Sequence, residues 1–291
     1  MVLLDGKKTA LDLREHLKNQ ISGRAAGVPS PKLAAILVGN NGASETYVAS
    51  KEKACHAAGI RSLLIRLPET CTEEELLTKI EDLNKDSDVD GILVQLPLPA
   101  HMNEQKITRS VASEKDVDGF HPENIGKLTL GLDTYIPATP LGIMKLLEAY
   151  NINTTGMHAL VIGRSAIVGT PVSLLLSRNS NPGNCTVTLA HSKTKNLSNL
   201  CLQADLIIAA LGKPEFLKAE MVKQGAIVID VGITRIESKD SEKGYRIAGD
   251  VDFESVAPKC SFITPVPGGV GAMTIAALLM NTVKAWQKRR F

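Results

Sequence analysis

The strongest constraint on the fold is the alternation of short apolar runs with helical patterns. Runs and patterns follow one another at residues 33–39, 44–60, 61–68, 72–86 and 90–99. Thr72 followed by Glu75 makes a capping box, which marks the start of the second helix. This β-α-β-α-β order predicts a parallel sheet with helices on both faces, so the first part of the chain is expected to be a three-layer α/β domain.

The periodicity stops between Ser113 and Pro140, where Gly, Pro and Asp are frequent. A structureless stretch of this length is uncommon and often functional. A helical pattern resumes at residues 141–151, which we expect to lead into a second domain. A chain of 291 residues also exceeds what one hydrophobic core usually serves.

The second domain repeats the alternation. Strands are predicted at residues 158–163, 186–192, 205–211, 225–233 and 260–266. A loop running into a helix follows the first of them, at residues 164–179, and a long helix with a basic end covers residues 272–291. We expect that last helix to pack back on the first domain.

Composition excludes several classes of protein. The net charge is +2 and aromatic residues make up 3%, which argues against a nucleic-acid surface. No apolar run approaches the ~20 residues of a membrane span, and the N-terminus does not resemble a secretory signal. Five widely spaced cysteines without a CxxC argue against a zinc site or a disulfide framework. A cytoplasmic enzyme or binding protein is therefore expected.

The turn after the first strand of the second domain has the setting of a dinucleotide-binding turn. Gly163 and Gly169 take the first and last glycine places of GxGxxG, but the spacing is longer and Ser165 lies where the middle glycine would be expected. Alone this is a weak match, and a plain strand-to-helix turn is the alternative.

The end of the next strand favours NADP over NAD. NAD-binding units usually place Asp or Glu there to hold the ribose. This chain instead has His191, Ser192, Lys193 and Lys195, and Arg164 adds a cation from the first turn. Cations and hydrogen-bond donors suit a 2′-phosphate. Taken singly, His191 and each of the two lysines are better explained as parts of a solvated loop.

One helix face in the first domain carries an unusual set of residues. Tyr47, Lys51 and Cys55 recur every four residues and share that face with apolar positions. Gln95 follows a buried strand, and Asp118 lies in the irregular segment. A lysine between an amide, an aspartate and a cleft would have a pKa lowered by burial and could transfer a proton near neutral pH.

Ordinary structural roles are the alternative for these residues. Lys51 could extend its stem along the core and reach water. Asp116 and Asp118 could fix a turn, and Gln95 could satisfy a strand edge.

A further feature is the sequence TPVPGGVGAMT. Pro265 and Pro267 stiffen the backbone ahead of Gly268 and Gly269, which make it permissive. We expect a loop that closely approaches a flat ligand, a domain hinge, or both, because ligand clefts favour domain junctions.

Six motifs in this order resemble the methylenetetrahydrofolate dehydrogenase/methenyltetrahydrofolate cyclohydrolase family, of the FolD type. They are YVASK, VQLPLP, KDVDGFHP, VIGRSAIVGTP, HSKT and PGGVG. The resemblance covers nearly the whole chain. It implies NADP-dependent oxidation of 5,10-methylenetetrahydrofolate to 5,10-methenyltetrahydrofolate and hydrolysis to 10-formyltetrahydrofolate, within one-carbon metabolism and purine biosynthesis.

The resemblance also implies an architecture, a homodimer of two-domain subunits. Composition and the expected chemistry predict no nucleic-acid, membrane or metal partner. A folate-binding catalytic domain is expected at 1–140, with 273–291 returning to it, and a Rossmann-like NADP-binding domain at 141–272.

Residue roles are implied position by position. Lys51 is the principal catalytic residue, Tyr47 stacks beside the folate, Gln95 tunes Lys51 and Asp118 holds the pterin. The implied substrate contacts are Tyr47, Lys51, Val94, Gln95, Leu96, Asp118, Pro267, Gly268 and Gly269. The implied NADP contacts are Gly163, Arg164, Ser165, Ser192 and Ile233.

Two positions depart from the family pattern. Ala138 stands where Cys is usual, and Ala272 stands where Pro is usual. Neither removes an acid–base group. An NAD-dependent dehydrogenase without hydrolase activity, and a non-catalytic folate- or nucleotide-binding regulator, remain the alternatives.

Overall fold

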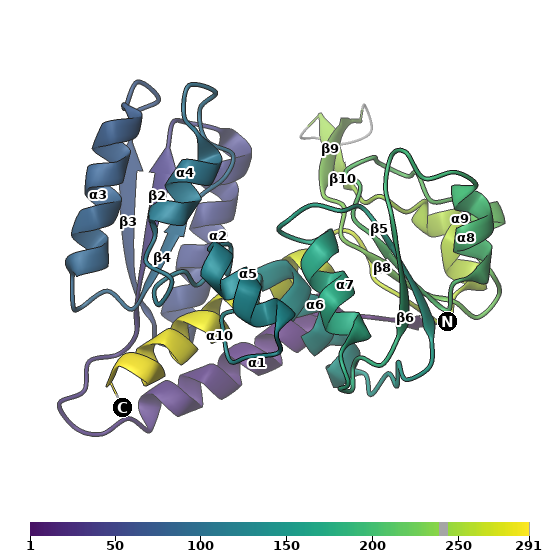
Figure 1. The fold of residues 1–291 in the computed structure, drawn as a ribbon, viewed down its shortest axis with the longest axis horizontal. Helices are drawn as coiled ribbons and strands as arrows, with labels where there is room; N and C mark the ends of the chain where they lie inside the picture. Colours follow the sequence, from purple (N-terminus) through teal and green to yellow (C-terminus); the bar gives the residue numbers. More distant parts are fainter. Residues whose placement is uncertain (239–243, 291) are drawn as a thin grey trace. The chain divides into compact units, whose positions relative to one another are not determined.

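The protein, described here as a computed structural model over residues 1–238 and 244–290, divides into two compact units (Figure 1). The Lys51 unit consists of Leu11–Ala138 and the chain from Ile275 on, and the Gly163 unit consists of Met1–Ala10 and Thr139–Thr274. Residues 1–10 therefore belong to the Gly163 unit, whereas the expected division places them in the first domain at 1–140. The reason is that strand β1 (Val2–Leu3) pairs with β11 (Phe262–Ile263) in the Gly163 unit.

A three-stranded parallel sheet forms the centre of the Lys51 unit. Its strands, in the order β3-β2-β4, are Arg61–Leu67, Lys32–Val38 and Gly91–Val94. The helices of this region are α2 (Gly42–Ala58), α3 (Glu73–Lys85) and α4 (Glu104–Ser110). The prediction of a parallel α/β sheet is confirmed.

Successive side chains of β2, the central strand, point to opposite faces of the sheet and pack against different helices. Ala34, Ile36 and Val38 pack with the buried face of α3, including Leu76 and Ile80. Helix α2 contacts β2 and β3 and covers the other face. The predicted capping box begins α3: Thr72 N donates to the Glu75 carboxylate at 2.8 Å, and Thr72 Oγ1 accepts from Glu75 N at 3.2 Å.

The segment 113–140 is not structureless, and that prediction is wrong. It contains α5 (Pro122–Thr129), and α6 (Ala138–Ala149) begins earlier than expected. Asp116 Oδ2 accepts from His121 N at 2.7 Å and from Asn124 Nδ2 at 2.9 Å. Two helical turns are too short to give a visible apolar period, which explains why the sequence pattern missed this helix.

The Gly163 unit is built on a six-stranded sheet in the order β1-β11-β8-β7-β5-β6, parallel throughout. Its remaining strands are β5 (His158–Ile162), β6 (Thr186–Ala190), β7 (Leu206–Ala209) and β8 (Ile227–Asp230). Helix α7 (Gly169–Ser177) contacts β5 and β6. The elements α8 (Leu197–Gln203), η1 (Ala219–Met221), α9 (Phe253–Val256) and η2 (Ala257–Lys259) contribute to a separate core cluster with the sheet.

One long helix and one strand pair are among the elements that have no counterpart in the sequence analysis. Helix α1 spans Gly6–Ser22, and an antiparallel pair joins β9 (Thr234–Glu237) to β10 (Tyr245–Ala248). The strands of this pair are four residues long and partly exposed, so they carry little apolar signal. None of the helices in the described ranges is long and apolar enough to cross a membrane.

The C-terminal helix α10 (Val270–Arg290) begins in the Gly163 unit and belongs to the Lys51 unit from Ile275 on, so most of it returns to the first part of the chain as expected. Asn281 is buried, and its amide nitrogen donates to Val117 O and to Ile136 O, each at 2.8 Å. The indole of Trp286 donates to Pro29 O at 2.8 Å. The last helix therefore holds the backbone on both sides of the segment that begins at Asp118.

Replacing Asn281 with Ala is expected to lower the free energy of unfolding by about 1–3 kcal/mol, because the buried Val117 carbonyl and the half-buried Ile136 carbonyl lose their donor. Urea unfolding followed by circular dichroism measures the change. The control is Gln287→Ala on an exposed position of the same helix. Equal stability of Asn281→Ala and the control would contradict the role given to this amide.

Candidate functional site

Lys51 is a buried lysine with one short polar contact. Its side chain is 6% exposed, and Nζ donates to Gln95 Oε1 at 3.0 Å. Gln95 is the first residue after β4, where its backbone N–H bonds Ile36 O at 2.9 Å. Its amide nitrogen donates to Leu96 O at 2.6 Å, which turns the amide oxygen toward the lysine. The amide thus holds one N–H of the amine.

Tyr47 and Asp118 complete the surroundings of Lys51. Nζ lies 4.5 Å from the centroid of the Tyr47 ring, one helical turn before it on α2. Burial lowers the pKa of Lys51, and the negative charge of Asp118 partly opposes that change. Burial raises the pKa of Asp118 to about 6, although the charge of Lys51 acts the other way. The structure therefore brings together all four residues predicted to be catalytic.

The position of Asp118 is set by its neighbours in the chain. Gly119 has φ +76°, and a Cβ there would lie 2.6 Å from Pro137 N, so only glycine fits. Burial also raises the pKa of Asp116, whose carboxylate instead bonds the following loop. Asp116 has a structural role, whereas the charge of Asp118 acts on Lys51.

The predicted dinucleotide turn of the Gly163 unit is very tight. A Cβ on Gly163, at φ +118°, would lie 2.0 Å from Ala210 O, and one on Gly169 would lie 1.8 Å from Gly163 O. Ser165 Oγ accepts from Val168 N at 3.2 Å, just ahead of helix α7. Both glycines are therefore required by close backbone approach, as the dinucleotide-binding fingerprint demands.

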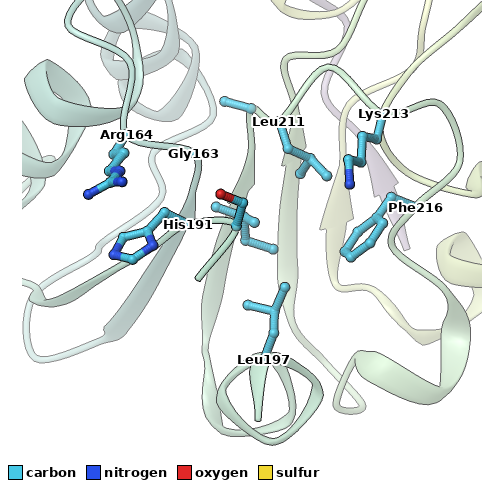
Figure 2. A pocket seen from close by; sticks show the side chains of 10 residues that line it. Gly163, Arg164, His191, Leu197, Leu211, Lys213 and Phe216 are labelled. Carbon is cyan, nitrogen blue, oxygen red and sulfur yellow. The ribbon is translucent and has the colours of Figure 1, made fainter. Parts of the chain in front are cut away.

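A cavity of about 290 Å³ opens beside this turn, at the carboxyl ends of β5, β6 and β7 (Figure 2). Its lining residues are Ile162, Gly163, Arg164, His191, Ser192, Leu197, Ala210, Leu211, Lys213 and Phe216. None of these ten lining residues carries a carboxylate. Arginine, serine and histidine beside a glycine turn fit a phosphate-bearing dinucleotide, and the absence of an acid among these lining residues fits a 2′-phosphate.

Three of the five predicted NADP contacts line this cavity, and Ser165 and Ile233 do not. Ile233 follows β8 and is 59% exposed, near Gly271. Sequence analysis missed Lys213 and Phe216. Their signal was available, because Gly212 and Pro214 mark a loop directly after β7, and ligands bind beyond the carboxyl ends of such strands.

The TPVPGG loop lies in the Gly163 unit. Lys7 N donates to Gly268 O at 3.0 Å, and Gly268 has φ +115°. A Cβ on Gly269 would lie 2.6 Å from Pro265 O. The loop therefore needs both glycines for its own turn. Contact of Pro267, Gly268 and Gly269 with a substrate stays a prediction.

The remaining sulfur and metal chemistry is limited. All five cysteines are buried with free thiols, and burial raises the pKa of Cys55 to about 12. Within residues 1–238 and 244–290, no group of three or more His, Cys, Asp or Glu is placed to hold a metal ion.

Comparison with known proteins places these features in one family. The catalytic-domain model of tetrahydrofolate dehydrogenase/cyclohydrolase matches residues 4–118, and its NAD(P)-binding-domain model matches residues 137–290. The bifunctional protein FolD of Cytophaga hutchinsonii is 57% identical, over 98% of this chain and 99% of that protein.

Solved structures agree. The bifunctional FolD enzyme from Campylobacter jejuni has a TM-score of 0.93 and 52% identity, covering 99% of both chains. The dehydrogenase-cyclohydrolase from Trypanosoma brucei, solved with NADP and an inhibitor, has a TM-score of 0.93 and 34% identity, covering 99% of this chain and 97% of that one. The chain belongs to the tetrahydrofolate dehydrogenase/cyclohydrolase family, of the FolD type.

Proposed function

We propose that this protein oxidises 5,10-methylenetetrahydrofolate to 5,10-methenyltetrahydrofolate with NADP and hydrolyses the product to 10-formyltetrahydrofolate. The observation that carries the proposal is a buried Lys51 amine facing Gln95, Tyr47 and Asp118, in a chain whose relatives are bifunctional. The use of NADP is supported by the cavity beside Gly163, because its lining residues include no Asp or Glu.

The oxidation makes few demands on acid–base groups. Bound NADP supplies a hydride acceptor, and the protein's part is to hold it in position. Gly163, Arg164 and Ser192 would hold the phosphate-bearing end. Ser165 and Ile233, which lie outside the cavity lining, are proposed contacts on the basis of the resemblance alone.

Hydrolysis requires a base for water. Water adds to the methenyl carbon and loses a proton, after which the bond from that carbon to one ring nitrogen breaks and that nitrogen takes up a proton. A lysine with a lowered pKa has neutral amine available to accept the first proton and return it. Asp118, with a raised pKa, is suited to hold a pterin nitrogen, and Val94 and Leu96 flank Gln95 as further substrate contacts.

We also propose that the enzyme is a cytoplasmic homodimer. The family resemblance supports the dimer, and the buried free thiols suit a reducing compartment. Light scattering after size-exclusion chromatography tests the dimer, and a monomeric mass would overturn it.

To test the function, the protein is mixed with 5,10-methylenetetrahydrofolate and NADP. Nicotinamide reduction is followed at 340 nm and methenyl consumption at 350 nm, and global fitting separates the two absorbance signals. Reduction without hydrolysis would favour a dehydrogenase alone. If neither NADP nor NAD is reduced, the result would favour a non-catalytic binding protein.

Lys51→Met is expected to reduce hydrolysis of methenyltetrahydrofolate at least ~100-fold, because it removes the proton acceptor while keeping the buried stem. Lys51→Ala should abolish that step as well. The affinity for NADP should be unchanged in both, measured by calorimetry. Lys53→Met, an exposed lysine on the same helix, is the matched control. Hydrolysis at the normal rate would remove Lys51 from the mechanism.

Asp118→Asn is expected to move the acidic midpoint of the hydrolase pH profile to lower pH. The Asp118 charge raises the pKa of Lys51, so its loss lets the amine stay neutral further into the acid range. The measurement is kcat/KM for hydrolysis as a function of pH. The control is Asp82→Asn, at an exposed position of α3. A shift toward higher pH would contradict this electrostatic coupling.

Arg164→Ala is expected to weaken NADP binding about 10- to 100-fold and NAD binding far less, because only NADP has the 2′-phosphate that a guanidinium would bond. Calorimetric Kd values for both cofactors check this. Equal losses would show that Arg164 contacts a part that the two cofactors share.

A further inference from the structure

The wall of the cavity opposite Arg164 has no assigned role. Figure 2 shows Arg164 and His191 on one side and Lys213 and Phe216 on the other, with Leu197 between them at the base. The Lys213 amine lies 5.8 Å from the centroid of the Phe216 ring. This wall therefore combines one cation with an aromatic and apolar surface.

The loop that carries this wall is fixed by a fully buried carboxylate. Asp250 Oδ2 accepts from Leu211 N at 2.7 Å and from Gly212 N at 2.9 Å. The far side of the loop is also bonded, because Leu217 N donates to Asp250 O at 2.9 Å. Lys213 lies between these anchors, so its backbone is held in place before any ligand binds.

The chemistry of the two walls differs. Arg164, His191 and Ser192 offer donors suited to phosphate oxygens. The other wall offers Leu211 and Phe216, and Leu197 adds an apolar base; together they form a surface on which a flat ring can stack, with the Lys213 donor beside it. A purine has apolar faces and ring nitrogens that accept hydrogen bonds, so it matches the second wall.

We propose that Lys213 is a cofactor-recognition residue that donates a hydrogen bond to the adenine ring of the dinucleotide, with Phe216 beside it as a stacking surface. The proposal rests on the proposed use of NADP. It differs from the role of Arg164, because adenine is common to NADP and NAD whereas the 2′-phosphate is not. Lys213 therefore contributes affinity without cofactor selectivity.

The test is calorimetric binding of NADP and NAD to the full-length wild type and to Lys213→Met. We expect both Kd values to rise by the same factor, about 3- to 10-fold, the loss of one hydrogen bond. Lys213→Arg keeps a donor and should recover most of the affinity. Lys145→Met, at a partly exposed lysine paired with Glu148 in the same unit, should bind as the wild type does.

Reduced nicotinamide mononucleotide, which lacks adenosine, serves as a second probe, and its binding should not respond to Lys213→Met. Unchanged Kd values for both dinucleotides would overturn the proposal. A loss confined to NADP would also overturn it, by placing Lys213 at the 2′-phosphate. If the wild type itself binds neither dinucleotide, the proposed function fails rather than this assignment.

Discussion

The hydrogen bond from Lys51 to Gln95 is the interaction on which the proposed chemistry depends. An ammonium in a site only 6% exposed is costly unless its charge is balanced or lost. Here the amide offers one acceptor and Asp118 a nearby charge, and burial still lowers the lysine pKa. The same surroundings that make the lysine costly to bury favour the neutral amine that the proposed proton transfer requires.

The two units supply different parts of the reaction. In the Lys51 unit, side chains from α2, the end of β4 and the loop before α5 meet around one amine. In the Gly163 unit, close backbone contacts at Gly163 and Gly169 form a turn beside a cavity. The first site depends on titratable side chains and the second on backbone shape, as expected when a cofactor carries the redox step.

Much of this could be predicted from sequence, for identifiable reasons. The parallel sheets were predicted because apolar strands alternate with long helices, and the capping box at Thr72 fixed one boundary. Lys51 stood out because a lysine on an apolar helix face is unusual. Helix α5 was missed because two turns give no clear period, and its stability comes instead from Asp116 and its bonds across the loop. Lys213 was missed because loop residues have no periodicity; Gly212 and Pro214 mark its loop after β7, but the fold is needed to place that loop across the cavity from Arg164.

The discontinuity of the Lys51 unit has a consequence for biosynthesis. Asn281 and Trp286 bond backbone groups that precede residue 138, and every residue of Thr139–Thr274 is translated in between. On the ribosome, these bonds to Val117, Ile136 and Pro29 can therefore form only after Thr139–Thr274 has been synthesised. The unit that carries Lys51 is thus completed only when the last helix has been made, although most of its chain is synthesised first.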